Sequence, residues 1–138
     1  MKLSTRIRYG TRLMVDLALN YNKGPLILNV ISKQEKVSKK YLEQIIRRLM
    51  SAHLVKSVRG PKGGYYLTKS PEKIKVLDII NAVEGPLILI DCLKNPNHCS
   101  LVKSCATRIY WQEVQNNLKK TFTNKTLKSL AERKLRTQ

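Results

Sequence analysis

The amino-acid sequence predicts a mainly α-helical fold with one small β-hairpin, followed by an irregular loop and a long helix. Apolar residues recur at helical spacing over most of residues 4–52. Two short strand-like runs, 54–59 and 65–68, flank a glycine-rich turn. Farther on, four apolar residues step by four between positions 110 and 122. With 138 residues, the chain is long enough for one domain with a modest core, or for one domain with an appendage.

Two helices are expected in the first quarter of the chain. Ser4 can cap the first one, and the Asn-Lys-Gly-Pro sequence at residues 22–25 ends it. Gly10 lies inside this helix and permits a close contact with another helix. A short second helix is expected over residues 28–34. The apolar face of the first helix consists of Leu13, Met14, Leu17, Ala18 and Tyr21.

A strongly amphipathic third helix is expected over residues 38–52, with Ser38 as its N-cap. Its apolar face contains Tyr41 or Leu42, followed by Ile45, Ile46 and Leu49. Its other face is polar and mostly cationic, and consists of Lys39, Lys40, Glu43, Gln44, Arg47 and Arg48.

The second half of the chain is expected to hold three more helices. One covers about residues 74–84, and no helical or strand period is recognisable from 91 to 104. The long helix follows, and Thr126 can cap a short last helix. Their apolar positions are Tyr110, Val114, Leu118 and Phe122 in the long helix and Leu127, Leu130 and Leu135 in the last one.

The charge of the chain points to a polyanionic partner. There are 27 Lys and Arg residues against 9 Asp and Glu residues, which gives a net charge of +18. Residues 1–75 hold 17 of the basic and 4 of the acidic residues, an excess of +13. No apolar run approaches the roughly 20 residues that span a bilayer, and no apolar stretch of signal-peptide length follows the basic N-terminus. We therefore expect a cytoplasmic protein that binds nucleic acid rather than a membrane.

The order of a short helix, a turn, an amphipathic helix and a hairpin with a basic, glycine-rich tip is that of a winged helix-turn-helix. In the third helix, Gln44 can pair with adenine, and Arg47 can pair with guanine or phosphate. A solvated helix and an ordinary hairpin would explain any one of these residues, but not the charge of the whole region. The candidate DNA-binding residues are Ser38, Lys39, Lys40, Tyr41, Glu43, Gln44 and Arg47 in the helix, and Arg59, Gly60, Pro61, Lys62 and Gly63 in the hairpin tip.

Three cysteines, Cys92, Cys99 and Cys105, lie in and around the irregular loop. An odd number fits a secreted disulfide framework poorly, and in a reducing compartment clustered cysteines favour metal or redox chemistry. The spacing leaves an iron–sulfur cluster, a zinc site, thiol redox chemistry and buried core thiols open. Three thiolates are one ligand short of an iron–sulfur set, and the nearest further donors are His98 and Asp91.

Five segments together resemble the IscR/NsrR family of bacterial winged-helix regulators, and most closely its cluster-biogenesis repressors. The resemblance runs from Met1 to about Leu130, and the hairpin tip and the Tyr-Leu-Glu-Gln string are its most specific parts. The matching segments are Met1–Ser4, Tyr41–Ile45, Val58–Tyr65, Val76–Gly85 and the three-cysteine loop.

This resemblance implies a homodimer on a palindromic operator in double-stranded DNA. Each third helix would enter a major groove through Ser38, Tyr41, Glu43 and Gln44, and each hairpin tip the adjacent minor groove through Arg59 and Gly60. The long helix would form the dimer through Tyr110, Val114 and Leu118. Cys92, Cys99 and Cys105 would hold an iron–sulfur cluster, [2Fe–2S] or [4Fe–4S].

The fourth cluster ligand does not carry over from the family. The cluster-biogenesis regulators have a histidine three positions after the third cysteine, where this chain has Arg108. The nitric-oxide sensors have an aspartate near the N-terminus, where this chain has Arg8. An arginine stays protonated and is a poor ligand. The fourth ligand therefore stays open: His98, a water, a small thiol or a carboxylate completes the set, or one iron has an open position.

The expected organisation is a winged helix-turn-helix domain at 1–85, a cluster-binding loop at 86–106, and a dimerisation helix with a short C-terminal helix at 107–138. The expected function is that of a regulator whose cluster state alters operator binding. A metal-free thiol-redox regulator of the same fold and an iron–sulfur carrier are the alternatives. The sequence contains no recognisable nucleophile–base pair and no phosphate-binding glycine pattern, so we do not expect an enzyme.

Overall fold

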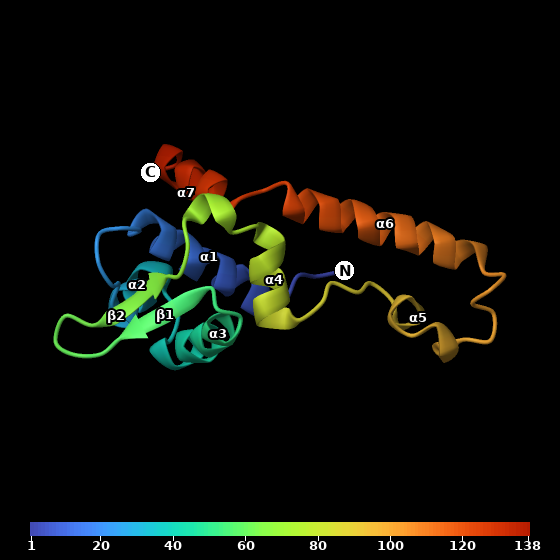
Figure 1. Ribbon diagram of the computed structural model, residues 1–138, viewed down its shortest axis with the longest axis horizontal. Helices are drawn as coiled ribbons and strands as arrows, with labels where there is room; N and C mark the ends of the chain where they lie inside the picture. Colours follow the sequence, from blue (N-terminus) through green and yellow to red (C-terminus); the bar gives the residue numbers. More distant parts are fainter.

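A computed structural model describes all residues of the chain, 1–138. Most of the elements form one body, and the segment after α4 extends from it with α6 as a long arm (Figure 1). No helix is both long enough and apolar enough to span a bilayer. The elements are α1 (Thr5–Leu19), α2 (Leu28–Glu35), α3 (Lys39–Ser51), β1 (Val55–Val58), β2 (Gly64–Leu67), the 3₁₀ turn η1 (Pro71–Lys73), α4 (Val76–Glu84), α5 (Asp91–Lys94), the 3₁₀ turn η2 (Pro96–His98), α6 (Ala106–Thr123) and α7 (Leu127–Arg136).

The core of the body lies where α1, α3, α4 and α7 meet, and α3 is oriented by it. Leu42, Ile45, Ile46 and Leu49 are all buried, as the predicted apolar face of this helix requires. A Cβ atom on Gly10 would lie 3.0 Å from Val83 Cγ1, so a residue without a side chain lets α1 and α4 approach closely.

The hairpin is an antiparallel pair whose register runs from Val55 opposite Leu67 to Val58 opposite Gly64. Its inner edge pairs with the chain before α2, because the amides of Leu26 and Tyr65 donate to each other's carbonyls at 2.8 and 3.0 Å. Gly64 makes this contact possible, since a Cβ there would lie 2.6 Å from the Leu26 carbonyl oxygen. The wing is therefore fastened to the body near the tip end of β2.

The last helix, α7, packs back onto the body beside α1 (Figure 1). Leu127 and Ala131 are buried in the common core, and the Leu127 amide donates to the Ile74 carbonyl at 2.8 Å. Leu135, expected on the apolar side of this helix, is 60% exposed, so that prediction is wrong. The last turn of α7 faces the body through Lys134 instead, whose amine contacts Asp16 and Glu35.

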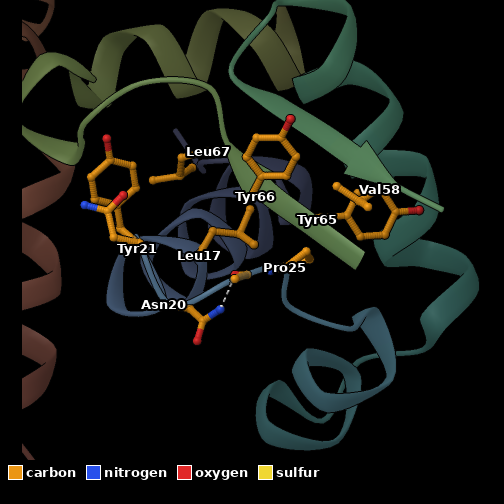
Figure 2. A pocket seen from close by; sticks show the side chains of 10 residues that line it. Leu17, Asn20, Tyr21, Pro25, Val58, Tyr65, Tyr66 and Leu67 are labelled. Carbon is orange, nitrogen blue, oxygen red and sulfur yellow. Dashed lines mark hydrogen bonds between the residues drawn. The ribbon is translucent and has the colours of Figure 1, made fainter. Parts of the chain in front are cut away.

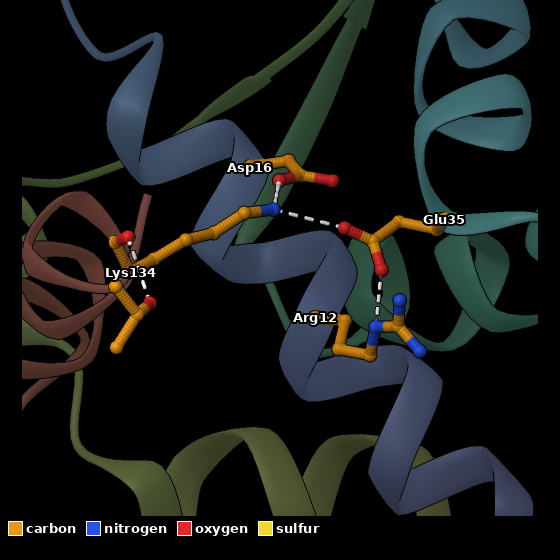
Figure 3. A network of polar contacts seen from close by, with 5 residues as sticks. Arg12, Asp16, Glu35 and Lys134 are labelled. Carbon is orange, nitrogen blue, oxygen red and sulfur yellow. Dashed lines mark hydrogen bonds and ion pairs between the residues drawn. The ribbon is translucent and has the colours of Figure 1, made fainter.

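A buried polar network also fastens α7 to α1 and α2 (Figure 3). The Nζ atom of Lys134 lies 2.5 Å from Asp16 Oδ1 and 2.9 Å from Glu35 Oε1. Arg12 pairs with the other carboxylate oxygen of Glu35. Both carboxylate side chains are 5% exposed, so they depend on these cations for their charge balance.

Candidate nucleic-acid interface and cysteine loop

The recognition-type face of α3 is open to solvent. Ser38, Lys39, Lys40, Gln44 and Arg47 are exposed, whereas Tyr41 and Glu43 are half-buried. The N-cap prediction is confirmed, because Ser38 Oγ accepts the Tyr41 amide at 3.2 Å. Since the oxygen acts as acceptor, the hydroxyl hydrogen stays available for a phosphate.

Two grooves run along opposite sides of this face. One, of about 420 Å³, lies between α3 and the hairpin. It brings together five of the sequence-predicted residues: Lys39, Glu43, Arg59, Gly60 and Gly63. Residues of α3 and of the hairpin tip, which are far apart in the sequence, therefore lie side by side.

The other groove, of about 930 Å³, lies between α3, α4 and the start of α1. It contains Tyr41, Gln44 and Arg47 from the predicted set. Arg6 and Arg48 also line it, and neither was among the predicted DNA-binding residues. The signal for Arg6 was only its charge near the N-terminus, because nothing in the sequence shows that α1 starts beside α3. Three guanidinium groups in one groove favour an anionic ligand.

The wing tip is a tight turn closed by the Gly63 amide, which donates to the Gly60 carbonyl at 2.9 Å. Gly60 has a φ of 110°, a conformation that side chains disfavour. Arg59, Gly60, Pro61 and Lys62 are exposed. The tip is therefore a narrow turn of backbone that carries the cationic side chains of Arg59 and Lys62. A minor groove admits an element of this shape and charge.

The cysteine loop lies at the far end of the arm, away from α3 (Figure 1). Residues 91–104, expected to be irregular, contain the single turns α5 and η2. Helical segments of three or four residues are too short to show a period in the sequence. Cys92 is on α5, Cys99 follows η2, and Cys105 is the N-cap residue of α6. The linker is held to α6 by the Leu89 amide, which donates to the buried Gln115 side chain at 2.9 Å.

The three cysteines are free thiols, and Cys105 is chemically distinct. The Thr107 hydroxyl lies 3.1 Å from Cys105 Sγ. This hydroxyl, followed by the backbone amide and the charge of Arg108, lowers the pKa of the Cys105 thiol. The lowered pKa favours the Cys105 thiolate, which is the form that ligates a metal or attacks an oxidant.

The donor set has the right chemistry for an iron–sulfur cluster but is not gathered as one. The three thiols and His98 come from one short segment, and His98 Nε2 lies 4.0 Å from Asp91 Oδ2. Arg108 donates instead to the Cys92 carbonyl, at 3.4 Å, which agrees with its being no ligand. No three His, Cys, Asp or Glu side chains lie close enough together to hold a metal ion. Cluster binding therefore needs the loop to close around its ligands.

The α6 helix exposes large apolar side chains along the arm. Ile109, Tyr110 and Trp111 are 63%, 57% and 41% exposed. Val114 and Leu118 are half-buried, and Gln115 is the buried residue of this helix. An exposed apolar surface of this kind is typical of a protein interface.

The comparisons with known proteins agree on one family. The model of the Rrf2 family, described as an iron-dependent transcriptional regulator, matches residues 3–133. The regulator CymR of Bacillus subtilis is 37% identical over 131 residues, which are 95% of this chain and 90% of the relative. Its solved structure, titled the global cysteine regulator of B. subtilis, has a TM-score of 0.78 at 34% identity and covers 96% and 97% of the two chains.

Two IscR proteins are similarly related. IscR of Escherichia coli O1:K1 is 37% identical over 130 residues, 94% of this chain and 80% of the relative. The structure of T. potens IscR has a TM-score of 0.82 at 35% identity and covers 100% of this chain and 91% of its own. The winged-helix fold and the family resemblance read from the sequence are thereby confirmed. The chain belongs to the Rrf2 family of transcriptional regulators.

Proposed function

We propose that the chain is a homodimeric regulator that binds palindromic double-stranded DNA, and whose cysteine loop holds an iron–sulfur cluster that modulates this binding. One observation carries the DNA-binding part. The groove between α3 and the wing brings Lys39, Glu43, Arg59, Gly60 and Gly63 together on an open, cationic surface. This surface fits a duplex whose major groove takes α3 and whose minor groove takes the tip.

Each predicted contact has a role that follows from its place. Gln44 and Glu43 read base edges, and Arg59 enters the minor groove. Phosphates are contacted by Ser38, Lys39, Lys40, Tyr41, Arg47 and Lys62. The shape of the tip is set by Gly60, Pro61 and Gly63.

The dimer explains the apolar side chains on the arm. The α6 helix leaves Tyr110 exposed and Val114 and Leu118 half-buried. A second copy of the same helix, related by a two-fold axis, would cover them. The symmetric pair then places two α3 helices on two half-sites, which is why the operator is expected to be a palindrome.

The cysteine loop is suited to sensing rather than to direct DNA contact. It lies at the far end of the arm from α3 (Figure 1), so its state reaches the DNA through the arrangement of the two arms. Cys92, Cys99 and Cys105 would hold the cluster, and the cationic side chains of Lys94, Lys103 and Arg108 lie on the same segment. A bound cluster supplies a redox-sensitive centre that ties the loop into one conformation.

A metal-free thiol-redox regulator is the second candidate. It is favoured by the lowered pKa of the Cys105 thiol and by the separation of the three cysteines in the structure. In that case Cys105 would react with an oxidant as its thiolate.

Iron and acid-labile sulfide analysis of anaerobically purified protein distinguishes the two candidates. We expect coloured protein with stoichiometric iron and sulfide, and a Mössbauer spectrum that gives the nuclearity. Cys92→Ser, Cys99→Ser and Cys105→Ser should each lose most of the iron, whereas Ser104→Ala, a neighbouring change in the same loop, should keep it. Colourless wild-type protein after anaerobic reconstitution would leave the thiol mechanism in its place.

A further inference from the structure

A pocket behind the wing has no part in the contacts described so far (Figure 2). It has a volume of about 450 Å³ and lies between the end of α1, the turn that follows it, and the hairpin. This volume is within the range of roughly 300–1,000 Å³ typical of small-molecule sites. The pocket is therefore large enough for a molecule of one or two rings.

Aromatic and apolar side chains form its walls. Leu17 and Leu67 make the buried floor, with exposed fractions of 2% and 4%. Tyr21 and Tyr66 stand beside it (Figure 2), whereas Tyr65, the neighbouring residue of β2, turns to the opposite face of the strand and packs against the core. Two rings beside an apolar floor offer the offset and edge-on contacts that a flat aromatic ligand makes.

The lining contains no charged residue, although the chain carries 27 Lys and Arg residues. A charged ligand would leave its charge unpaired there, so the chemistry selects a neutral one. The only hydrogen bond drawn among the lining residues runs from Asn20 Nδ2 to the Gly24 carbonyl, at 2.8 Å (Figure 2). The tyrosine hydroxyls are thus not tied to their neighbours in the pocket, and they can pair with one polar group of a ligand.

We propose that this pocket binds a neutral, flat aromatic molecule with one or two hydrogen-bonding groups. The ligand contacts α1 on one side and both hairpin strands on the other, since Val58 lies on β1 and Tyr66 on β2. Val58 directly precedes Arg59 of the wing tip, so a ligand that favours one wing position would change the affinity for DNA. This last consequence rests on the proposed DNA-binding function, whereas ligand binding itself does not.

Titration calorimetry of the full chain without DNA tests the pocket, with indole as the neutral probe and indole-3-carboxylate as its anionic counterpart. We expect saturable binding of one indole per chain, and binding of the carboxylate at least about tenfold weaker. Val58→Trp fills the pocket and should weaken indole binding at least about tenfold. Val30→Trp is the matched control, because Val30 and Val58 are 40% and 44% exposed and only Val58 lines the pocket.

Circular dichroism shows whether each variant is folded, and Tyr66→Ala, which removes an exposed wall, repeats the test if Val58→Trp is not. The proposal is overturned if indole does not bind saturably, or if the anion binds equally well. It is also overturned if the folded pocket variants bind indole like Val30→Trp. Because no DNA is present, these outcomes leave the proposed regulatory function untouched.

Discussion

Replacing Lys134 with Met should destabilise the fold by about 3 kcal/mol, because it leaves buried carboxylates without their shared cation. Lys134 Nζ lies between Asp16 Oδ1 and Glu35 Oε1, and both carboxylates are nearly inaccessible to water. Methionine keeps the apolar stem and removes only the charge. The effect lies at the lower end of the range for a broken buried ion pair, since Glu35 retains Arg12. Urea unfolding at pH 7 measures it.

The matched control for this variant is Lys128→Met on the same helix. Lys128 pairs with Glu72 at 2.6 Å, but the two side chains are 50% and 62% exposed. We expect little change in stability there, because water screens an exposed pair. Equal effects of the two substitutions would contradict the buried network as an anchor of α7.

The destabilisation by Lys134→Met should depend on pH. Burial raises the pKa of Asp16 already in the wild type, against the opposing effect of Lys134, and removing that lysine raises it further. Lys134 and the Arg12 charge hold the pKa of Glu35 low against the effect of burial, so the wild type loses this stability as the pH falls. Because of both effects, the difference in the free energy of unfolding between wild type and variant should be largest at pH 7. It should become smaller as the pH falls towards 4.

Replacing Gln44 with Ala should cost about 1–3 kcal/mol at each half-site, and therefore about 2–6 kcal/mol for a dimer on its full operator. Gln44 is exposed on α3 and lines the groove with Arg47, where a base edge can reach its amide. The loss should fall on one base pair per half-site, so the variant should tolerate changes at that position. Competition binding on duplexes selected from a random library, with each base pair changed in turn, measures this.

Lys39→Ala provides the contrast to Gln44→Ala. Lys39 is exposed at the start of α3 and lines the groove beside Arg59. A phosphate contact carries no sequence information, so this variant should bind all duplexes more weakly and lower the salt dependence by about one unit per half-site. If Lys39→Ala relaxed the sequence preference and Gln44→Ala weakened all duplexes alike, the recognition face would be misplaced.

Much of the α3 surface and the wing could be predicted from local patterns. The four buried residues of α3 and its exposed cationic face follow from the helical period alone. Gly60 and Gly63 could be placed in a turn by composition, and the structure uses them there. Local sequence suffices in these cases because a helical face and a turn are both determined by residues that are close together in the sequence.

The contacts between distant segments could not be predicted in this way. Asp16 and Glu35 look like ordinary surface acids, and only the return of Lys134 over about a hundred residues makes their burial possible. The pairing of Leu26 with Tyr65 had one signal, Gly64, which lacks the side chain that would block it. Whether the cysteines gather depends on a bound group that the residue pattern does not contain.

The central claim is that the state of the cysteine loop sets the affinity for DNA, and anaerobic fluorescence anisotropy tests it most directly. The same preparation is measured on its selected operator with its cluster intact and after gentle removal of iron and sulfide. We expect dissociation constants that differ by about tenfold or more, the usual size of coupling between two sites. Equal affinities of the two forms for every operator would contradict it.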